Sequence, residues 1–270
     1  MDCAKLIAFG SYHSEDIWDY IKGEKNPYGL SKLSLILIPT YPSSGSEYGL
    51  GAVCTDSRTG NFGTAYGITA DIAILVPKYS MSLDKEMTAY TGLVTLVQLS
   101  VSTIGDHNPV SYDIGISVIK NVLNATKKLK DDPKDEEARG IILYGAAIST
   151  SGRLGLGKEE NYAYDIYELE FIPEILFDVP YRQSLTTLFP RFLKAIAKYH
   201  HEDIIRYFND VFDYQGTVEE SVNQMIELFE ELGIDMNFDG KVFIKDIKEI
   251  DVSTLFSMDE ILDIIQNCLC

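Results

Sequence analysis

The strongest constraint on the fold is a change of hydrophobic period near residue 82. Before it, short apolar segments alternate with turn residues, which is typical of an α/β layer. One helix and four strands are expected there, at Asp2–Ala8, Leu33–Pro39, Gly51–Cys54, Phe62–Ile68 and Ile72–Val76. After it, apolar residues recur with a helical period, as Val118, Val122 and Ala125 do. We therefore expect an incomplete α/β part over residues 1–82 and an all-helical bundle over residues 83–270.

Two local features refine the helical half. The segment Lys127–Glu137 is rich in charge and is interpreted as a connector between helices. Pro190 interrupts the apolar segment Leu185–Tyr199, so a helix is expected to start or kink there.

Charge and length exclude several classes of partner. The 270 residues carry a net charge of −18, with 41 acidic against 23 basic side chains, and so would repel a phosphate backbone or an anionic membrane. No apolar run reaches the roughly 18 residues that span a bilayer. We expect a cytoplasmic protein with neither a nucleic acid nor a membrane as partner. Its four cysteines lie far apart except for the terminal pair Cys268 and Cys270, which is too close for an easy bridge, so all four are interpreted as free thiols.

The segment Ile38–Glu47 is the first candidate for a binding loop. Seven of its ten residues are Pro, Gly, Ser or Thr, and it follows the apolar run Leu35–Leu37. A strand that opens into small residues allows backbone N–H groups and hydroxyls to approach a ligand closely. An ordinary surface loop would have the same composition, so both interpretations remain open at this point.

Several motifs together resemble the iron-containing (group III) alcohol dehydrogenases. The residues that carry the resemblance are Leu37–Thr40, Gly45–Glu47, Thr59–Gly60, Ala73–Pro77, Met87–Gly92, Glu136–Gly140, Asp178–Tyr181 and Leu188–Pro190. Their order and spacing agree with the family from Asp2 to about Asp213. The segment Asn161–Asp165 is most similar to the D-W-A-x-H segment of the butanol-dehydrogenase branch.

The resemblance implies both a fold and a chemistry. Residues 1–82 would be the remnant of a Rossmann-like dinucleotide-binding domain, and residues 83–270 the family's helical domain. The implied activity is NAD- or NADP-dependent oxidation of a small alcohol or reduction of an aldehyde, with Fe²⁺ or Zn²⁺ polarising the oxygen. The family's glycine-rich phosphate turn would lie before Met1, so we expect an N-terminally truncated member.

The same resemblance assigns candidate site residues. In the loop Ile38–Glu47, the positions that would face the cofactor are Thr40, Ser44 and Ser46. Tyr41 departs from the family's second threonine, and Phe62 stands where many members have a lysine.

The four positions of the family's metal ligands are the main departure. The family uses an Asp, a His four residues later and two further His. Here the first pair falls on Val94 and Gln98, and the last His falls on Tyr181. The remaining one falls on Asp165 by the D-W-A-x-H register, which we prefer, or on Tyr167 by counting back from Tyr181. None of His13, His107, His200 and His201 occupies a ligand position.

Two hypotheses for function follow. One is an NAD(P)-dependent alcohol or aldehyde oxidoreductase, and the other is a catalytically inactive, truncated paralogue with a structural or oligomeric role. Because an incomplete sheet exposes an edge, we also expect a homo-oligomer. A separate pattern, Asp235–Asp246, follows the spacing of a calcium loop, but Met236 and Phe238 are apolar where such loops are solvated.

Overall fold

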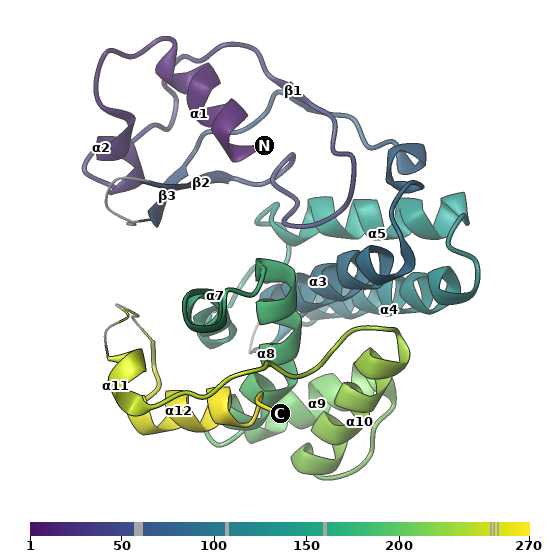
Figure 1. The fold of residues 1–270 in the computed structure, drawn as a ribbon. Helices are drawn as coiled ribbons and strands as arrows, with labels where there is room; N and C mark the ends of the chain where they lie inside the picture. Colours follow the sequence, from purple (N-terminus) through teal and green to yellow (C-terminus); the bar gives the residue numbers. More distant parts are fainter. Residues whose placement is uncertain (57–61, 106–107, 159–160, 249, 251, 253) are drawn as a thin grey trace.

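The computed structural model describes residues 1–270 apart from 57–61, 106–107, 159–160, 249, 251 and 253. Figure 1 shows an α/β part, which contains the N-terminus, above a larger helical part, which contains the C-terminus. The predicted fold class, an incomplete α/β part followed by an all-helical bundle, is confirmed. No helix in the part of the chain that the structure describes has the length and apolarity needed to cross a bilayer.

The α/β part contains two small sheets. Strands β2 (Gly51–Thr55) and β3 (Phe62–Tyr66) form an antiparallel hairpin. Strands β1 (Ile36–Leu37) and β4 (Ile72–Ala73) pair in parallel, with Ile36 opposite Ile72. Both β1 and β4 are shorter than the strands predicted around them, because turns and loops take up the rest of those segments.

Two helices complete this part. Helix α1 (Asp2–Gly10) packs on β2, and α2 (Ile17–Ile21) packs on β3. Their apolar side chains form a small core with the hairpin, made of Leu6, Phe9, Tyr20, Ile21, Ala52, Ala65 and Ile68. This core is separate from the larger core of the helical part.

Three long helices form the centre of the helical part. After the short helix η1 (Pro77–Ser80), they are α3 (Lys85–Thr103), α4 (Pro109–Asp131) and α5 (Glu136–Ser149). Each begins at a capping residue, Asp84, Asn108 or Asp135, whose side chain accepts a backbone N–H of the first turn. From Thr88 onward α3 is buried throughout, so it is the central helix.

The remaining helices complete the helical part. In chain order they are η2 (Tyr162–Asp165), α6 (Ile166–Leu169), α7 (Phe171–Phe177), α8 (Tyr181–Ile196), α9 (His201–Phe212), α10 (Val218–Glu231), α11 (Ile244–Ile247) and α12 (Met258–Gln266). Helix α8 packs on α3 and connects the central helices to α10 and α12.

Two local predictions were wrong. The connector expected at Lys127–Glu137 is only residues 132–135, because the charged flanks form the last turn of α4 and the first turn of α5. A helix does not start at Pro190, since α8 continues through it, and the kink expected as the alternative stays a prediction. Proline removes one helical hydrogen bond, but Phe189 and Phe192 are fully buried on either side, so packing holds the helix there.

Candidate functional site

The loop Ile38–Glu47 rests on the C-terminal end of α5. Gly45 has φ of 66°, and a Cβ atom there would come within 1.9 Å of the Ala146 carbonyl oxygen. The Thr150 hydroxyl donates to the Gly45 carbonyl at 3.0 Å. The position therefore needs glycine both for its backbone conformation and for the close approach.

The other side of the loop is fastened to α1. The Ser46 hydroxyl donates to the carboxylate of Asp2. Lys5 is fully buried and donates to the carbonyls of Gly49 at 3.1 Å and Gly51 at 2.7 Å. Burial lowers the pKa of Lys5, although Asp2 and Glu47 oppose the shift. The loop is thus held between α1 and α5.

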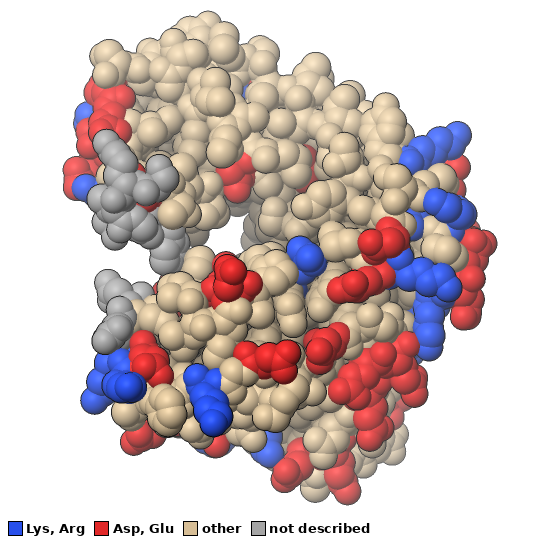
Figure 2. Space-filling model, viewed as in Figure 1, with Lys and Arg blue, Asp and Glu red and all other residues tan. Residues whose placement is uncertain are grey.

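The three predicted cofactor residues have different surroundings. Thr40 is exposed and Ser44 is half-buried, whereas Ser46 is buried and its hydroxyl is used by Asp2. Figure 2 shows the molecule hollowed between the α/β part and the helical part. Thr40 and Ser44 remain predictions as cofactor contacts, and Ser46 has a visible role in holding the loop.

The predicted metal positions on α3 are occupied by a buried, neutral pair. Val94 and Gln98 lie one turn apart and are 1% and 2% exposed. The amide nitrogen of Gln98 donates to the hydroxyl oxygen of Tyr181, the first residue of α8, at 3.0 Å. Ser149 at the end of α5 lies 3.4 Å from the amide oxygen of Gln98, but its single hydroxyl hydrogen has a closer acceptor, the Ala146 carbonyl at 2.8 Å.

The fourth position has two candidate residues, Asp165 and Tyr167, which lie in different surroundings. Asp165, the preferred residue, accepts from the Thr254 hydroxyl at 2.8 Å and from the Leu255 N–H at 2.6 Å. Its carboxylate is therefore committed to the segment before α12. The ring of Tyr167 lies beside that of Tyr164, with centroids 5.6 Å apart. The choice between the two registers stays a prediction.

The titratable groups around this pair favour their neutral forms. Desolvation raises the pKa of both Tyr181 and Tyr167 well above 10, with Glu170 adding to each shift. The carboxyl of Glu170 is 4% exposed and one of its oxygens has no hydrogen-bond partner, and burial raises its pKa well above the usual 4.5. At neutral pH the tyrosines are therefore uncharged phenols.

Such a donor set does not fit a catalytic divalent metal. Fe²⁺ and Zn²⁺ in proteins are held by carboxylate, imidazole or thiolate groups. Val94 has no donor atom, Gln98 offers only a neutral amide oxygen, and Tyr167 and Tyr181 offer phenol oxygens, so none of the four is a carboxylate, imidazole or thiolate. Among the residues that the structure describes, no group of three or more His, Cys, Asp or Glu side chains could hold an ion.

Other candidate metal or thiol positions have structural roles. His13 lies 2.8 Å from the Ser31 carbonyl, and the ring of His200 stacks on Tyr162 with centroids 3.6 Å apart. His107 lies outside the described residues. All four cysteines are free, as predicted.

The calcium-loop pattern also has a structural explanation. Met236 and Phe238 are fully buried, so the alternating apolar residues of this segment belong to the core, while Asp235 and Asp239 are exposed. The carboxylate of Asp246 accepts the N–H of Phe243 at 2.9 Å and caps α11.

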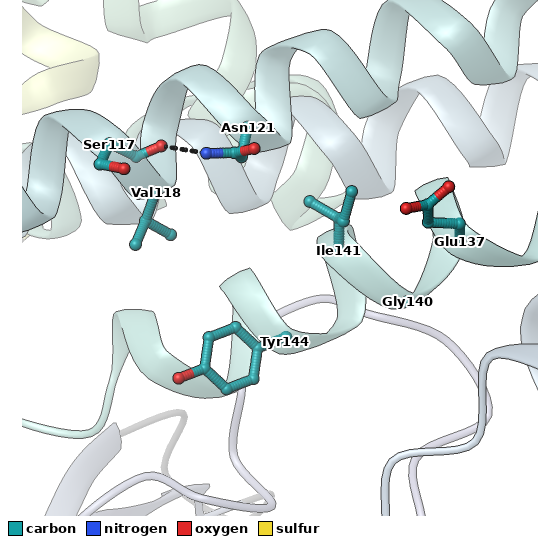
Figure 3. A pocket seen from close by; sticks show the side chains of 7 residues that line it. All are labelled: Ser117, Val118, Asn121, Glu137, Gly140, Ile141 and Tyr144. Atoms are coloured by element: carbon teal, nitrogen blue, oxygen red, sulfur yellow. Dashed lines mark hydrogen bonds between the residues drawn. The ribbon is translucent and has the colours of Figure 1, made fainter.

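A groove of about 400 Å³ lies between α4 and α5, as Figure 3 shows. Val118, Ile141 and Tyr144 supply its apolar lining. Asn121 donates its amide to the Ser117 carbonyl of its own helix at 2.8 Å, so that N–H group is already used. None of the predicted site residues lines this groove.

Sequence reasoning missed the residues that anchor the loop. Asp2 and Lys5 were noticed only as helix formers, and Thr150 was not singled out. Their roles depend on contacts with residues more than forty positions away, which no local pattern reports. A lysine on the apolar face of a short helix, beside Leu6 and Phe9, was the available signal for Lys5.

Two family models match the chain. The model described as "Iron-containing alcohol dehydrogenase" matches residues 1–77, and "Fe-containing alcohol dehydrogenase family, C-terminal" matches residues 104–259. Probable NADH-dependent butanol dehydrogenase 1 of Bacillus subtilis is 26% identical over 202 residues, which are 72% of this chain and 50% of that protein. NADH-dependent butanol dehydrogenase A of Clostridium acetobutylicum is 24% identical over 210 residues, which are 73% of this chain and 50% of that protein. The chain thus spans about half the length of these relatives.

Solved structures share the fold. NADH-dependent butanol dehydrogenase A of Thermotoga maritima superposes with a TM-score of 0.86 at 19% identity, over 100% of this chain and 74% of that one. The YqhD protein of Escherichia coli K-12 gives a TM-score of 0.85 at 18% identity, over 99% of this chain and 74% of that one. At such identities the likeness concerns the fold alone.

Proposed function

This chain belongs to the iron-containing alcohol dehydrogenase family, and we propose that it is a member without metal-dependent alcohol dehydrogenase activity of its own. The hydrogen bond between Gln98 and Tyr181 carries the proposal, because it occupies the position where the family resemblance places metal ligands. Val94 beside it offers no lone pair. Removing several groups that act as a unit normally abolishes the chemistry they perform together.

An assay of hydride transfer tests this proposal. The purified protein is incubated anaerobically with Fe²⁺ or Zn²⁺. In one direction, the loss of NADH or NADPH absorbance is followed in the presence of butyraldehyde. In the other, the reduction of NAD⁺ or NADP⁺ is followed in the presence of butanol. The Thermotoga maritima butanol dehydrogenase is the positive control. We expect no rate above buffer for this chain. A rate that disappears with chelator would contradict the proposal.

The second candidate is an active NAD(P)-dependent alcohol or aldehyde oxidoreductase. It is favoured by the relatives, which are named as NADH-dependent butanol dehydrogenases, and by the small-residue loop Ile38–Glu47. On this hypothesis Thr40 and Ser44 would contact the nicotinamide end of the cofactor while Ser46 holds the loop in place. Binding alone is tested by NADH fluorescence: a shift that Ser44→Ala weakens would support a retained cofactor site, and no shift would remove this candidate.

The proposed role without catalysis is association with a second copy of the chain. Residues 1–82 would be the remnant of the dinucleotide-binding domain, and residues 83–270 the helical domain. Ile36 and Ile72 are paired across β1 and β4, and two residues further along, Ile38 and Ile74 follow on the same side. All four are exposed. Parallel strands are normally covered on both faces, so this isoleucine face is a candidate interface.

The charge around the isoleucine face is compatible with self-association. Lys32 and Asp71, which flank the two strands, neutralise each other at 2.7 Å. Figure 2 shows few charged side chains over the α/β part on the visible face and many over the helical part. Two copies with a net charge of −18 each would therefore approach with least repulsion through the α/β part.

A further inference from the structure

The contact between α3 and α8 depends on one buried polar pair. Gln98 lies in the middle of α3 at 2% exposure, and its amide N–H reaches only one acceptor in the described structure, the hydroxyl oxygen of Tyr181. Tyr181 is the first residue of α8, where the helix has no side-chain cap. A buried donor that lost its acceptor would carry the full cost of its desolvation. The pair therefore joins the first residue of α8 to the middle of α3.

A second contact holds α8 beside the end of α6. The Ser184 hydroxyl donates to the Glu170 carbonyl at 2.6 Å, which fixes α8 beside the end of α6. Tyr181 lies about one helical turn before Ser184, and Tyr167 about one turn before Glu170. The ring of Tyr167 also lies 5.6 Å from that of Tyr164, whose hydroxyl is 3.4 Å from Ser102 on α3. These contacts hold α6 and the start of α8 near the end of α3.

We propose that the Gln98–Tyr181 hydrogen bond is a metal-independent link that fixes the first turn of α8 onto α3. It joins an amide to a phenol hydroxyl at 3.0 Å, so the contact forms between the two side chains directly. This inference does not rest on the absence of activity, because its tests measure metal content and unfolding only.

Metal content and heat stability give the first test. The protein is incubated with a molar excess of ZnSO₄ or, anaerobically, of ferrous ion, passed through gel filtration and analysed by mass spectrometry for metal. We expect far less than one ion per chain, and an unfolding midpoint that is the same with zinc, with ferrous ion and with EDTA. One retained ion per chain that raises the midpoint would overturn the proposal.

A double-mutant cycle gives the second test. Tyr181→Phe strands the Gln98 amide without an acceptor, so we expect its unfolding midpoint to fall by several degrees. Gln98→Leu removes the donor and replaces it with an apolar side chain of similar size. Because replacing both partners leaves no buried polar group unpaired, the double variant should unfold at a higher temperature than Tyr181→Phe alone.

The control is Tyr144→Phe on α5, which removes a hydroxyl from an exposed tyrosine and should leave the midpoint unchanged. If the two substitutions at Gln98 and Tyr181 lowered the midpoint additively, the residues would not form a link, and the proposal would be wrong. If Tyr181→Phe behaved like the control, it would also be wrong.

Discussion

Gly45 lies so close to Ala146 that a Cβ atom on Gly45 would come within 1.9 Å of the Ala146 carbonyl oxygen. The loop is therefore seated directly on the backbone of α5. We predict that Gly45→Ala destabilises the protein by roughly 3 kcal/mol, because the side chain forces the loop off α5 in addition to the strain of a left-handed backbone. Urea unfolding followed by circular dichroism measures the change.

Gly23→Ala is the matched control. Gly23 has φ of 75°, close to that of Gly45, but a Cβ there would meet nothing within 4 Å. It should cost only about 1 kcal/mol, the strain of the left-handed conformation alone. Equal losses in the two variants would show that the close contact with Ala146 contributes nothing.

The buried carboxyl of Glu170 predicts a specific pH dependence of stability. Its pKa in the folded protein lies well above the usual 4.5, mainly because burial disfavours the charge. The folded state therefore holds a proton that the unfolded state releases. This contribution is complete below about pH 4.5 and is lost as the pH rises towards the folded-state pKa, at about 1.4 kcal/mol per pH unit.

Glu170→Gln removes this titration while keeping the shape of the side chain. We expect the stability of the wild type, minus that of the variant, to be constant at low pH and to fall as the pH rises above about 4.5. The exposed substitution Glu227→Gln should follow the wild type across the range. Parallel curves for the wild type and Glu170→Gln would mean that this carboxyl is ionised normally in the folded state.

The order of elements was predictable because it depends on local pattern. Near Ser82 the apolar residues change from short alternating segments to a helical period. In the structure the α/β part ends and the helical bundle begins close to this point. Pro190 shows where such reasoning ends. The packing of Phe189 and Phe192 comes from distant elements and outweighs a local helix breaker.

The candidate site was predictable in its residue types but not in its pairings. That Val94, Gln98 and Tyr181 are poor metal ligands followed from their side chains. That Gln98 donates to Tyr181 did not, because 83 residues separate them. The hydrogen bonds of Asp165 were unpredictable for a similar reason, since Thr254 and Leu255, which donate to it, are remote in sequence.

The placement of Tyr167 can be tested by building a metal site. The variant Val94→Asp/Gln98→His/Tyr167→His/Tyr181→His supplies one carboxylate and three imidazoles, a donor set that suits zinc. We expect it to retain about one zinc per chain after gel filtration, and the wild type to retain far less.

The matched variant replaces Asp165 by His and leaves Tyr167 unchanged. It should bind zinc at least tenfold more weakly, because position 165 faces the segment around Thr254 and Leu255. Equal or tighter zinc binding by this second variant would return Asp165 to the site and show that the Tyr167 register is incorrect.

The isoleucine face, formed by Ile36, Ile38, Ile72 and Ile74, leads to a prediction about assembly. If it joins two copies, sedimentation velocity at micromolar concentration should show a dimer. Ile36→Glu/Ile72→Glu places two charges in the middle of the face and should shift the species to a monomer, because buried carboxylates without partners are costly. Ile175→Glu on α7, which is equally exposed but distant in the fold, should leave the dimer intact. A monomeric wild type would rule out the proposed interface, and a dimer that survives the double substitution would place the contact on another surface.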